Sequence, residues 1–229
     1  MEFLKENFYT IMLVISVVLT TLSMIRYIYS IIKGKTKPNI VGWLLYQIAT
    51  ICVLIGAYEL ESTTTIALTL VFSISQFIVI ILSFRYGFVK FSGTESFYFG
   101  VSMIFLLFWI IAKHDPELMK VLHMTERGLD ISLITANTLI EVMGAIAIFT
   151  KLYHHPETED SHAWLLSWLG GLAGIVAANS LAYEDLLYPV YLFTTNLAIW
   201  LLCFRKKPRH RFTWLFHALE KVVGKNWRS

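Results

Sequence analysis

The sequence predicts an all-α membrane protein that crosses the bilayer seven times, and two observations lead to this class. Hydrophobic residues make up 56% of the 229-residue chain and charged residues only 15%, whereas about a quarter is charged in a soluble domain. The apolar residues also form continuous runs of about the length that a helix needs to cross the hydrocarbon core. Continuous runs favour helices over the alternating strands of a membrane barrel, so we expect almost no strand.

Each predicted helix corresponds to one of these runs. In chain order they are approximately Phe8 to Ile32, Ile40 to Tyr58, Thr64 to Phe84, Phe97 to Ala112, Leu129 to Phe149, Ala163 to Ala182, and Leu186 to Phe204. The seven helices use nearly the whole of residues 1–207, so we expect a single membrane domain. Residues 208–229 place apolar side chains at helical spacing between basic ones, which predicts an amphipathic helix on anionic inner-leaflet lipid.

The chain repeats one pattern of residues in its first three and last three helices. A lysine is followed by a proline five residues later, then by a Trp-Leu-Leu step, a Tyr-Glu pair, and an amide nine residues before an arginine. We therefore expect a 3+1+3 arrangement, in which repeat one (about 8–85) and repeat two (about 129–205) flank a linker helix (about 97–112). The first copy is Lys33, Pro38, Trp43-Leu44-Leu45, Tyr58-Glu59, Gln76 and Arg85, and the second is Lys151, Pro156, Trp164-Leu165-Leu166, Tyr183-Glu184, Asn196 and Arg205.

The distribution of charge predicts the orientation of this integral, multi-pass protein. Lysines and arginines concentrate in the loops after helices one and three and in the tail, whereas the loops after helices two and six are acidic. Positive loops stay in the cytoplasm, so we expect the N-terminus outside and the C-terminus inside. Helices one and five then enter the membrane from the same side, which makes the repeat parallel rather than inverted.

Two short motifs relate this arrangement to a known superfamily. The run Ile31-Ile32-Lys33-Gly34-Lys35-Thr36 leads into Pro38, and the second helix ends in Gly56-Ala57-Tyr58. With the 3+1+3 arrangement, these residues resemble the SWEET and PQ-loop (MtN3-like) superfamily of seven-helix carriers, although the chain has no Pro-Gln dipeptide. The resemblance implies a substrate pocket lined by one amide from the third helix of each repeat. Those amides would be Gln76 and Asn196.

The same two amides are candidates from the residues alone. Gln76 and Asn196 lie at equivalent depths in otherwise apolar segments, where an amide is costly unless its hydrogen bonds are made. Facing each other, they would clamp a sugar or an amino acid. The alternative is that they only hold neighbouring helices together, at roughly 1 kcal/mol each. Further candidates for substrate binding are Trp200, Asn179 and Gln47.

Glu141 is the candidate for coupling a proton. It lies near the middle of the fifth predicted helix, with Asn137 one turn earlier on the same face. A carboxylate at that depth is costly, so we expect Glu141 to be protonated, paired or facing a wet cavity. In the alternative interpretation it is a structural acid, hydrogen-bonded to Asn137, Asn179 or a backbone carbonyl.

Aromatic residues and glycines receive mainly structural interpretations. Trp43 and Trp164 fall near the ends of their helices, where amphipathic rings prefer the headgroup region. Trp200 would either stack on a sugar or fill the core. Gly170 and Gly174 form a Gly-x3-Gly face, which predicts the close approach of another helix.

Catalytic and metal-binding patterns are weak in this sequence. His154, His155 and His162 crowd one loop with acidic residues, but their spacing differs from the helical His-Glu-x-x-His pattern of zinc enzymes. No nucleophile elbow, phosphate loop or dinucleotide fingerprint occurs. We therefore expect no cofactor and no enzymatic activity, and the three histidines remain the metal candidates.

Three classes of function remain open. The repeat, the amide pair and Glu141 favour a carrier for a small polar solute such as a sugar, an amino acid or a vitamin-like compound. A seven-helix sensor or assembly factor would use the same fold without transport, and a metal-dependent membrane enzyme would need the histidine loop. The expected partners are a small solute, membrane lipids and further copies of the chain, but not nucleic acid, since the net charge is only +3.

Overall fold

The computed structural model describes residues 7–38, 40–87, 93–154, 156–178 and 180–204. These residues contain helices and no strands, which confirms the all-α prediction for this part of the chain. The predicted amphipathic segment 208–229 lies outside it. The elements are α2 (Phe8–Ile32), α3 (Ile40–Glu59), α4 (Thr63–Tyr86), α5 (Gly93–His114), α6 (Pro116–Val121), α7 (Glu126–His154), the 3-10 helix η1 (Pro156–Thr158), α8 (Ser161–Ala177) and α9 (Tyr183–Cys203).

Five of these helices, α2, α3, α4, α7 and α9, are long and apolar enough to cross a membrane. Within the described residues, Phe99–His114 of α5 and Ser161–Ala177 of α8 are apolar but shorter. Each of the seven predicted segments thus corresponds to one apolar helix, and the chain has the composition and helix lengths of a membrane protein.

The predicted end of the sixth segment is wrong. A helix from Ala163 to Ala182 was expected, but α8 stops at Ala177 and the next residue has an extended backbone. Ser180 instead contacts the start of α9, because its hydroxyl donates to the Asp185 carboxylate and accepts a hydrogen bond from the Ala182 amide. Such local side-chain bonds compete with the helix, and an apolar composition does not reveal them.

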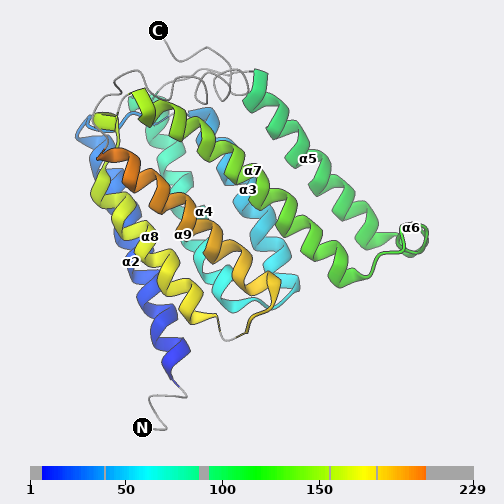
Figure 1. Ribbon diagram of the computed structural model, residues 1–229. Coiled ribbons are helices and arrows are strands. Elements are labelled where there is room, and N and C mark those ends of the chain that lie inside the picture. Colours follow the sequence, from blue (N-terminus) through cyan, green and yellow to red (C-terminus); the bar gives the residue numbers. More distant parts are fainter. Residues whose placement is uncertain (1–6, 39, 88–92, 155, 179, 205–229) are drawn as a thin grey trace, which may run out of the picture.

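One match in the repeated pattern is also wrong. Tyr58-Glu59 forms the last turn of α3, whereas Tyr183-Glu184 forms the first turn of α9. Both pairs lie at the same end of the bundle, but one ends a helix and the other begins one (Figure 1). Their similarity therefore reflects the end of the bundle at which they lie rather than corresponding helices.

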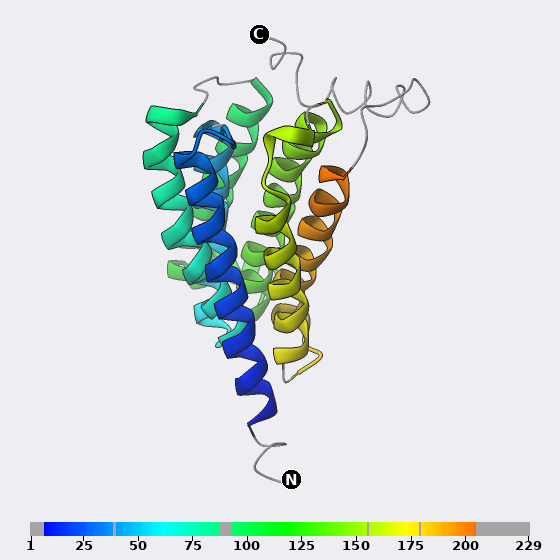
Figure 2. The same ribbon diagram turned by 90° about the vertical axis from the view of Figure 1, so that its left-hand side faces the viewer.

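Helices from the two halves of the chain interleave along a common direction (Figure 1, Figure 2). α2 packs most extensively against α8, and α3 packs against α7. α3 also packs on α4, and α8 on α9. α5 contacts α7 and α3 at the edge of the bundle, and the short α6 extends beyond it (Figure 1). α2 begins at the end of the bundle opposite to the one where α9 finishes (Figure 2).

Glycines in α8 allow the closest of these contacts. A Cβ atom on Gly170 would lie 2.5 Å from Thr20 Oγ1 in α2, and one on Gly171 would lie 2.6 Å from the Phe193 backbone nitrogen in α9. Ser16 Oγ of α2 also donates to the Gly170 carbonyl at 2.7 Å. The predicted close approach at the Gly-x3-Gly face is confirmed, since Gly174 likewise leaves only 3.0 Å for a Cβ atom.

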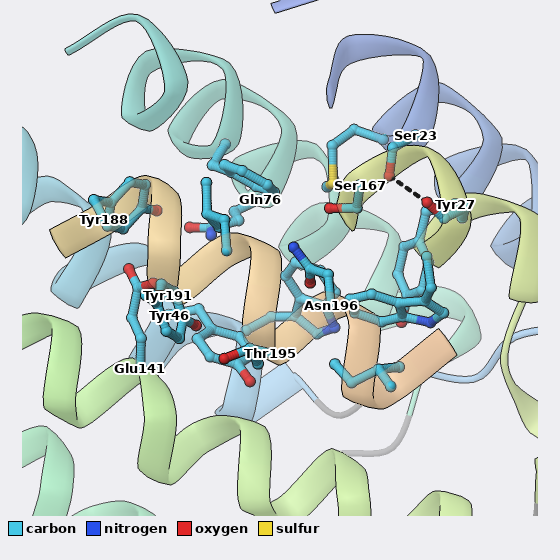
Figure 3. Close-up of a pocket in the computed structure, with 17 residues that line it drawn as sticks. Ser23, Tyr27, Tyr46, Gln76, Glu141, Ser167, Tyr188, Tyr191, Thr195 and Asn196 are labelled. Carbon is cyan, nitrogen blue, oxygen red and sulfur yellow. Dashed lines mark hydrogen bonds between the residues drawn. The ribbon is translucent and has the colours of Figure 1, made fainter. Parts of the chain in front are cut away.

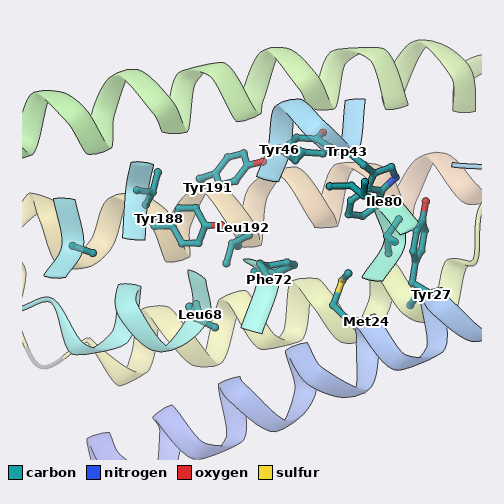
Figure 4. Packing of buried hydrophobic residues seen from close by; sticks show 14 of the residues in the cluster. Met24, Tyr27, Trp43, Tyr46, Leu68, Phe72, Ile80, Tyr188, Tyr191 and Leu192 are labelled. Atoms are coloured by element: carbon teal, nitrogen blue, oxygen red, sulfur yellow. The ribbon is translucent and has the colours of Figure 1, made fainter. Parts of the chain in front are cut away.

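The centre of the bundle is rich in aromatic rings (Figure 4). Rings from α2, α3, α4 and α9 form one buried cluster, into which Met24, Leu68 and Leu192 also pack. This cluster surrounds the cavity described below. The aromatic residues labelled in the view are Tyr27, Trp43, Tyr46, Phe72, Tyr188 and Tyr191.

An ionic cluster ties α5 to the rest of the bundle at the end where α7 begins. Lys113 of α5 pairs with Glu59 of α3 at 2.9 Å and with Asp130 of α7 at 3.2 Å. Trp109 Nε1 of α5 donates to the same Asp130 at 2.8 Å. The carboxyl group of Asp130 is therefore buried but well partnered.

Candidate functional site

A cavity of about 50 Å³ lies inside the bundle where helices of both halves of the chain meet (Figure 3). One water molecule needs roughly 10–15 Å³, so the cavity has room for a few water-sized groups. Its wall is formed by α2, α3, α4, α7, α8 and α9. Three of the residues proposed from the sequence line it, namely Gln76, Glu141 and Asn196.

The two predicted amides are therefore brought together in one cavity. Gln76 of α4 donates through Nε2 to Thr50 Oγ1 at 3.1 Å, but its buried Oε1 has no hydrogen-bond partner among the described residues. The buried Nδ2 of Asn196 in α9 likewise has no acceptor in that part of the chain. An unmet buried polar group costs about 1–3 kcal/mol, so a solute or water that satisfies the free acceptor and the free donor is favoured here.

Glu141 faces the interior rather than lipid, as expected, because only 2% of its surface is exposed. Thr50 Oγ1 donates to Glu141 Oε1 at 2.6 Å. Because Gln76 donates to the same threonine oxygen, Thr50 connects the amide to the acid in one hydrogen-bonded chain. The protonation state of Glu141 is thereby linked to an amide that lines the cavity.

Tyrosine side chains surround the carboxyl group of Glu141. Tyr188 and Tyr191 of α9 and Tyr46 of α3 interact with it, and the labelled Tyr46, Tyr191 and Glu141 lie close together in Figure 3. Gly144 of α7 makes room for this arrangement, since a Cβ atom there would lie 2.8 Å from the Tyr46 ring. Among the described lining residues, Glu141 is the single carboxylic acid, and none is a lysine, arginine or histidine.

The placement of Trp43 and Trp164 corrects the expectation of a headgroup position. Both line the cavity, and Trp43 is only 7% exposed. The Tyr27 ring lies between them, 5.3 Å from Trp43 and 5.7 Å from Trp164. Trp164 Nε1 also donates to Glu159 Oε2 at 3.2 Å. Tyr27 lies near the end of α2, and Trp43 and Trp164 lie near the starts of α3 and α8, so these three rings line the cavity on the side where α2 finishes.

Asn137 does not hydrogen-bond to Glu141, which corrects that part of the structural interpretation. Its Oδ1 accepts from Ser102 Oγ of α5 at 2.7 Å, and its Nδ2 donates to the Leu133 carbonyl at 2.9 Å. Four residues along a helix rotate a side chain by about 40°. That rotation is enough to direct Asn137 toward α5 while Glu141 points at Thr50.

Two other candidates lie away from the cavity. Gln47 of α3 is buried, donates to Ser73 Oγ of α4 at 2.7 Å, and is not among the lining residues. The Trp200 ring packs 5.7 Å from Trp168 and 5.2 Å from Phe204. Trp200 and Trp168 are only partly buried and Phe204 is exposed, so Trp200 neither lines the cavity nor belongs to the buried core.

The remaining candidates cannot be placed in the cavity. Asn179 and His155 lie outside the described residues, and of His154 only the helical backbone is described. His162 is exposed, with Nδ1 3.9 Å from the Asp160 carboxylate. No group of three or more histidine, cysteine or acidic side chains is arranged to hold a metal within the described ranges.

Several cavity residues were missed at the level of the sequence. The most informative signal was in α2, where polar residues recur every three or four positions in an apolar run and all are buried. Ser23 and Tyr27 of this stripe reach the cavity. The repeated Trp-Leu-Leu step was a second signal, because both of its tryptophans line the cavity. The stripe consists of Ser16, Thr20, Ser23, Tyr27 and Ser30.

Comparison of the chain with models of known protein families, with curated proteins and with solved structures finds no match.

Proposed function

We propose that this protein is a membrane carrier that moves a small polar solute through the central cavity between two three-helix repeats. The observation that carries the proposal is the position of Gln76 and Asn196. They occupy corresponding places in the repeated pattern and line one internal cavity, and each has one buried polar atom without a partner in the part of the chain that the structure describes. Many carriers bind their substrates between repeats in this way. The SWEET and PQ-loop superfamily, which the sequence resembles, has the same proposed organisation.

The packing of the helices supports a parallel 3+1+3 repeat. When α2, α3 and α4 are matched to α7, α8 and α9, each major contact has a counterpart. The contact of α2 with α8 matches that of α7 with α3, and the contact of α3 with α4 matches that of α8 with α9. Matched helices run in the same direction (Figure 1), as a rotation about an axis along the bundle requires.

Burial supports the same correspondence, independently of residue identity. A shift of 120 residues maps buried positions of α4 onto six of the seven buried positions of α9. A shift of 121 residues maps buried positions of α3 onto six of the seven buried positions of α8. Under the first shift Gln76 falls on Asn196, and under the second Trp43 falls on Trp164. Both pairs line the cavity.

Glu141 is the proposed proton-coupling group. A carboxylate in an apolar membrane interior costs at least a few kcal/mol, so Glu141 holds a proton while the cavity is closed and exchanges it when the cavity opens to water. Thr50 passes the change on to Gln76 through their hydrogen bond. Transport then requires the bundle to open at alternate ends, because a cavity of about 50 Å³ is too small for a sugar.

Flux into liposomes tests the carrier proposal without knowledge of the substrate. Proteoliposomes are shrunk in a concentrated sugar, polyol, amine or amino acid, and light scattering reports re-swelling as the solute enters. We expect re-swelling with a subset of solutes and its loss in Gln76→Ala and Asn196→Ala. Gln47→Ala is the matched control, since Gln47 is also a buried glutamine with one donated bond and an unmet Oε1 among the described residues. Equal losses in Gln76→Ala and Gln47→Ala would contradict a substrate role for Gln76.

The proposal includes an outside N-terminus and a cytoplasmic C-terminus. A chain carrying Cys52→Ala and Cys203→Ala receives one new cysteine, at Thr63 or at Lys35, which lie at opposite ends of the bundle and are exposed. In intact cells, an impermeant maleimide should label Thr63→Cys but should label Lys35→Cys only after permeabilisation. The reverse pattern would invert the assigned orientation.

A sensor that binds a solute without moving it is the second candidate. The small volume of the closed cavity favours it, because no path to either end is needed for binding. A solute that stabilises the purified protein but never re-swells proteoliposomes would select this alternative.

A further inference from the structure

We propose that the cavity selects a small organic ammonium ion that also carries a hydrogen-bond acceptor, in preference to a neutral sugar or an anion. This inference rests on the proposed function, since it names the class of solute that the central cavity takes. It follows from the charge of the lining, the kind of surface around it, the two unused polar atoms and the volume.

The charge of the lining favours a cation. Glu141 is the one carboxylic acid on the described wall, and no lysine, arginine or histidine opposes it there. An anionic solute would meet a carboxyl group without a countercharge. A cation would instead form a buried ion pair with Glu141, which is the arrangement in which a buried charge is tolerated.

The aromatic surface favours a cation for a second reason. Seven of the seventeen lining residues are tyrosine, tryptophan or phenylalanine. Aromatic faces attract ammonium groups through their quadrupole, and the attraction grows when the site is desolvated. A neutral polyol gains no comparable electrostatic energy from the faces of the rings.

The two unused polar atoms define the ends of the solute. Gln76 Oε1 has no hydrogen-bond partner among the described residues, and Gln76 is joined to Glu141 through Thr50, so the amide and the acid belong to one part of the wall. An ammonium group placed there donates to both. Asn196 lies farther toward Ser23 and Ser167 (Figure 3), and its free Nδ2 donates to an acceptor on the other end of the solute.

The volume sets the size of the solute that fits without opening the bundle. About 50 Å³ accommodates roughly three to five water-sized groups. Ethanolamine has a comparable number of non-hydrogen atoms, with an ammonium group at one end and a hydroxyl oxygen at the other. Propan-1-ol has nearly the same shape without the charge, and glycolate carries the opposite charge.

Binding of the cation should release a proton from Glu141. The neutral acid is the cheaper form in the empty cavity, whereas the ammonium ion pairs with the carboxylate. The titratable groups that face Glu141 are Tyr46 and Cys52 of α3 and Tyr188 and Tyr191 of α9. Phenol and thiol groups are neutral when protonated and negative when ionised, so none of them supplies a positive charge that would replace the cation.

Calorimetric titration of the purified full-length protein in detergent tests the inference. We expect ethanolamine to bind at least about tenfold more tightly than propan-1-ol or glycolate, with proton release seen as heat that varies with the ionisation enthalpy of the buffer. Glu141→Gln should retain the Thr50 bond, lose the selectivity and release no proton. Glu184→Gln is the control, because this buried acid of α9 pairs with Arg127 and lies outside the lining.

Each outcome decides between the two proposals. Equal binding of the three probes, or binding of ethanolamine without proton release, would overturn the ammonium inference even if Glu141→Gln failed to fold. Selective, proton-releasing binding without flux into liposomes would uphold the inference and reject the carrier. Flux of neutral solutes with no preference for ethanolamine would uphold the carrier and reject the ammonium inference.

Discussion

Replacing Thr50 by valine should show how strongly the amide and the acid depend on their common hydroxyl. Thr50 is fully buried, accepts from Gln76 Nε2 at 3.1 Å and donates to Glu141 Oε1 at 2.6 Å. Valine keeps the shape and the β-branch of threonine, so packing and helix propensity change little. The variant therefore removes two hydrogen bonds and leaves a buried amide and a buried acid with fewer partners.

The expected magnitude follows from those two bonds. Hydrogen bonds between membrane helices average about 0.6 kcal/mol and reach about 1.7 kcal/mol, so the loss of both predicts about 1–3 kcal/mol of destabilisation. Thr138→Val is the matched control. Thr138 is a buried threonine of α7 whose Oγ1 has no hydrogen-bond partner within the described residues, so its removal should be neutral or slightly stabilising.

Reversible unfolding of the purified variants in mixed micelles measures both changes. The reasoning predicts a clear loss of unfolding free energy in Thr50→Val and none in Thr138→Val. If the two variants lose equal stability, the hydroxyl of Thr50 does not act through Gln76 and Glu141, and the proposed link between acid and amide fails.

Two further perturbations test the packing of the bundle. Gly171→Ala should cost about 1–3 kcal/mol, because its Cβ atom would meet rigid backbone atoms of α9. Gly100→Ala, whose Cβ atom would meet no described atom within 4 Å, should gain up to about 1 kcal/mol from helix propensity. The unfolding midpoints of the two variants measure the difference, and similar shifts in both would contradict the close contact at Gly171. Lys113→Met leaves the buried Asp130 without its cation and should lower the free energy of unfolding by about 1–3 kcal/mol. The control Lys120→Met breaks an exposed ion pair and should change the free energy of unfolding by less than about 0.5 kcal/mol. Equal effects of the two lysine variants would show that Asp130 does not need Lys113.

Sequence reasoning was most successful where a property depends on composition along a single helix. The continuous apolar runs located seven helices, and the Gly-x3-Gly face indicated the close approach of α8 to its neighbours. It failed where local chemistry competes with apolar composition. The sixth segment ends at Ala177, and Ser180 bonds to Asp185 at the start of α9 instead of continuing the helix. The periodicity of the apolar run does not predict that bond.

Depth and polarity alone identified Gln76, Asn196 and Glu141 as interior residues, because hydrocarbon tolerates few polar groups. Only the tertiary structure decided which of the other polar side chains join them. Gln47 and Asn137 are as polar as Gln76, yet each bonds to a neighbouring helix away from the cavity. The direction of a side chain depends on which helix packs against it, and that choice is made by contacts between distant parts of the chain.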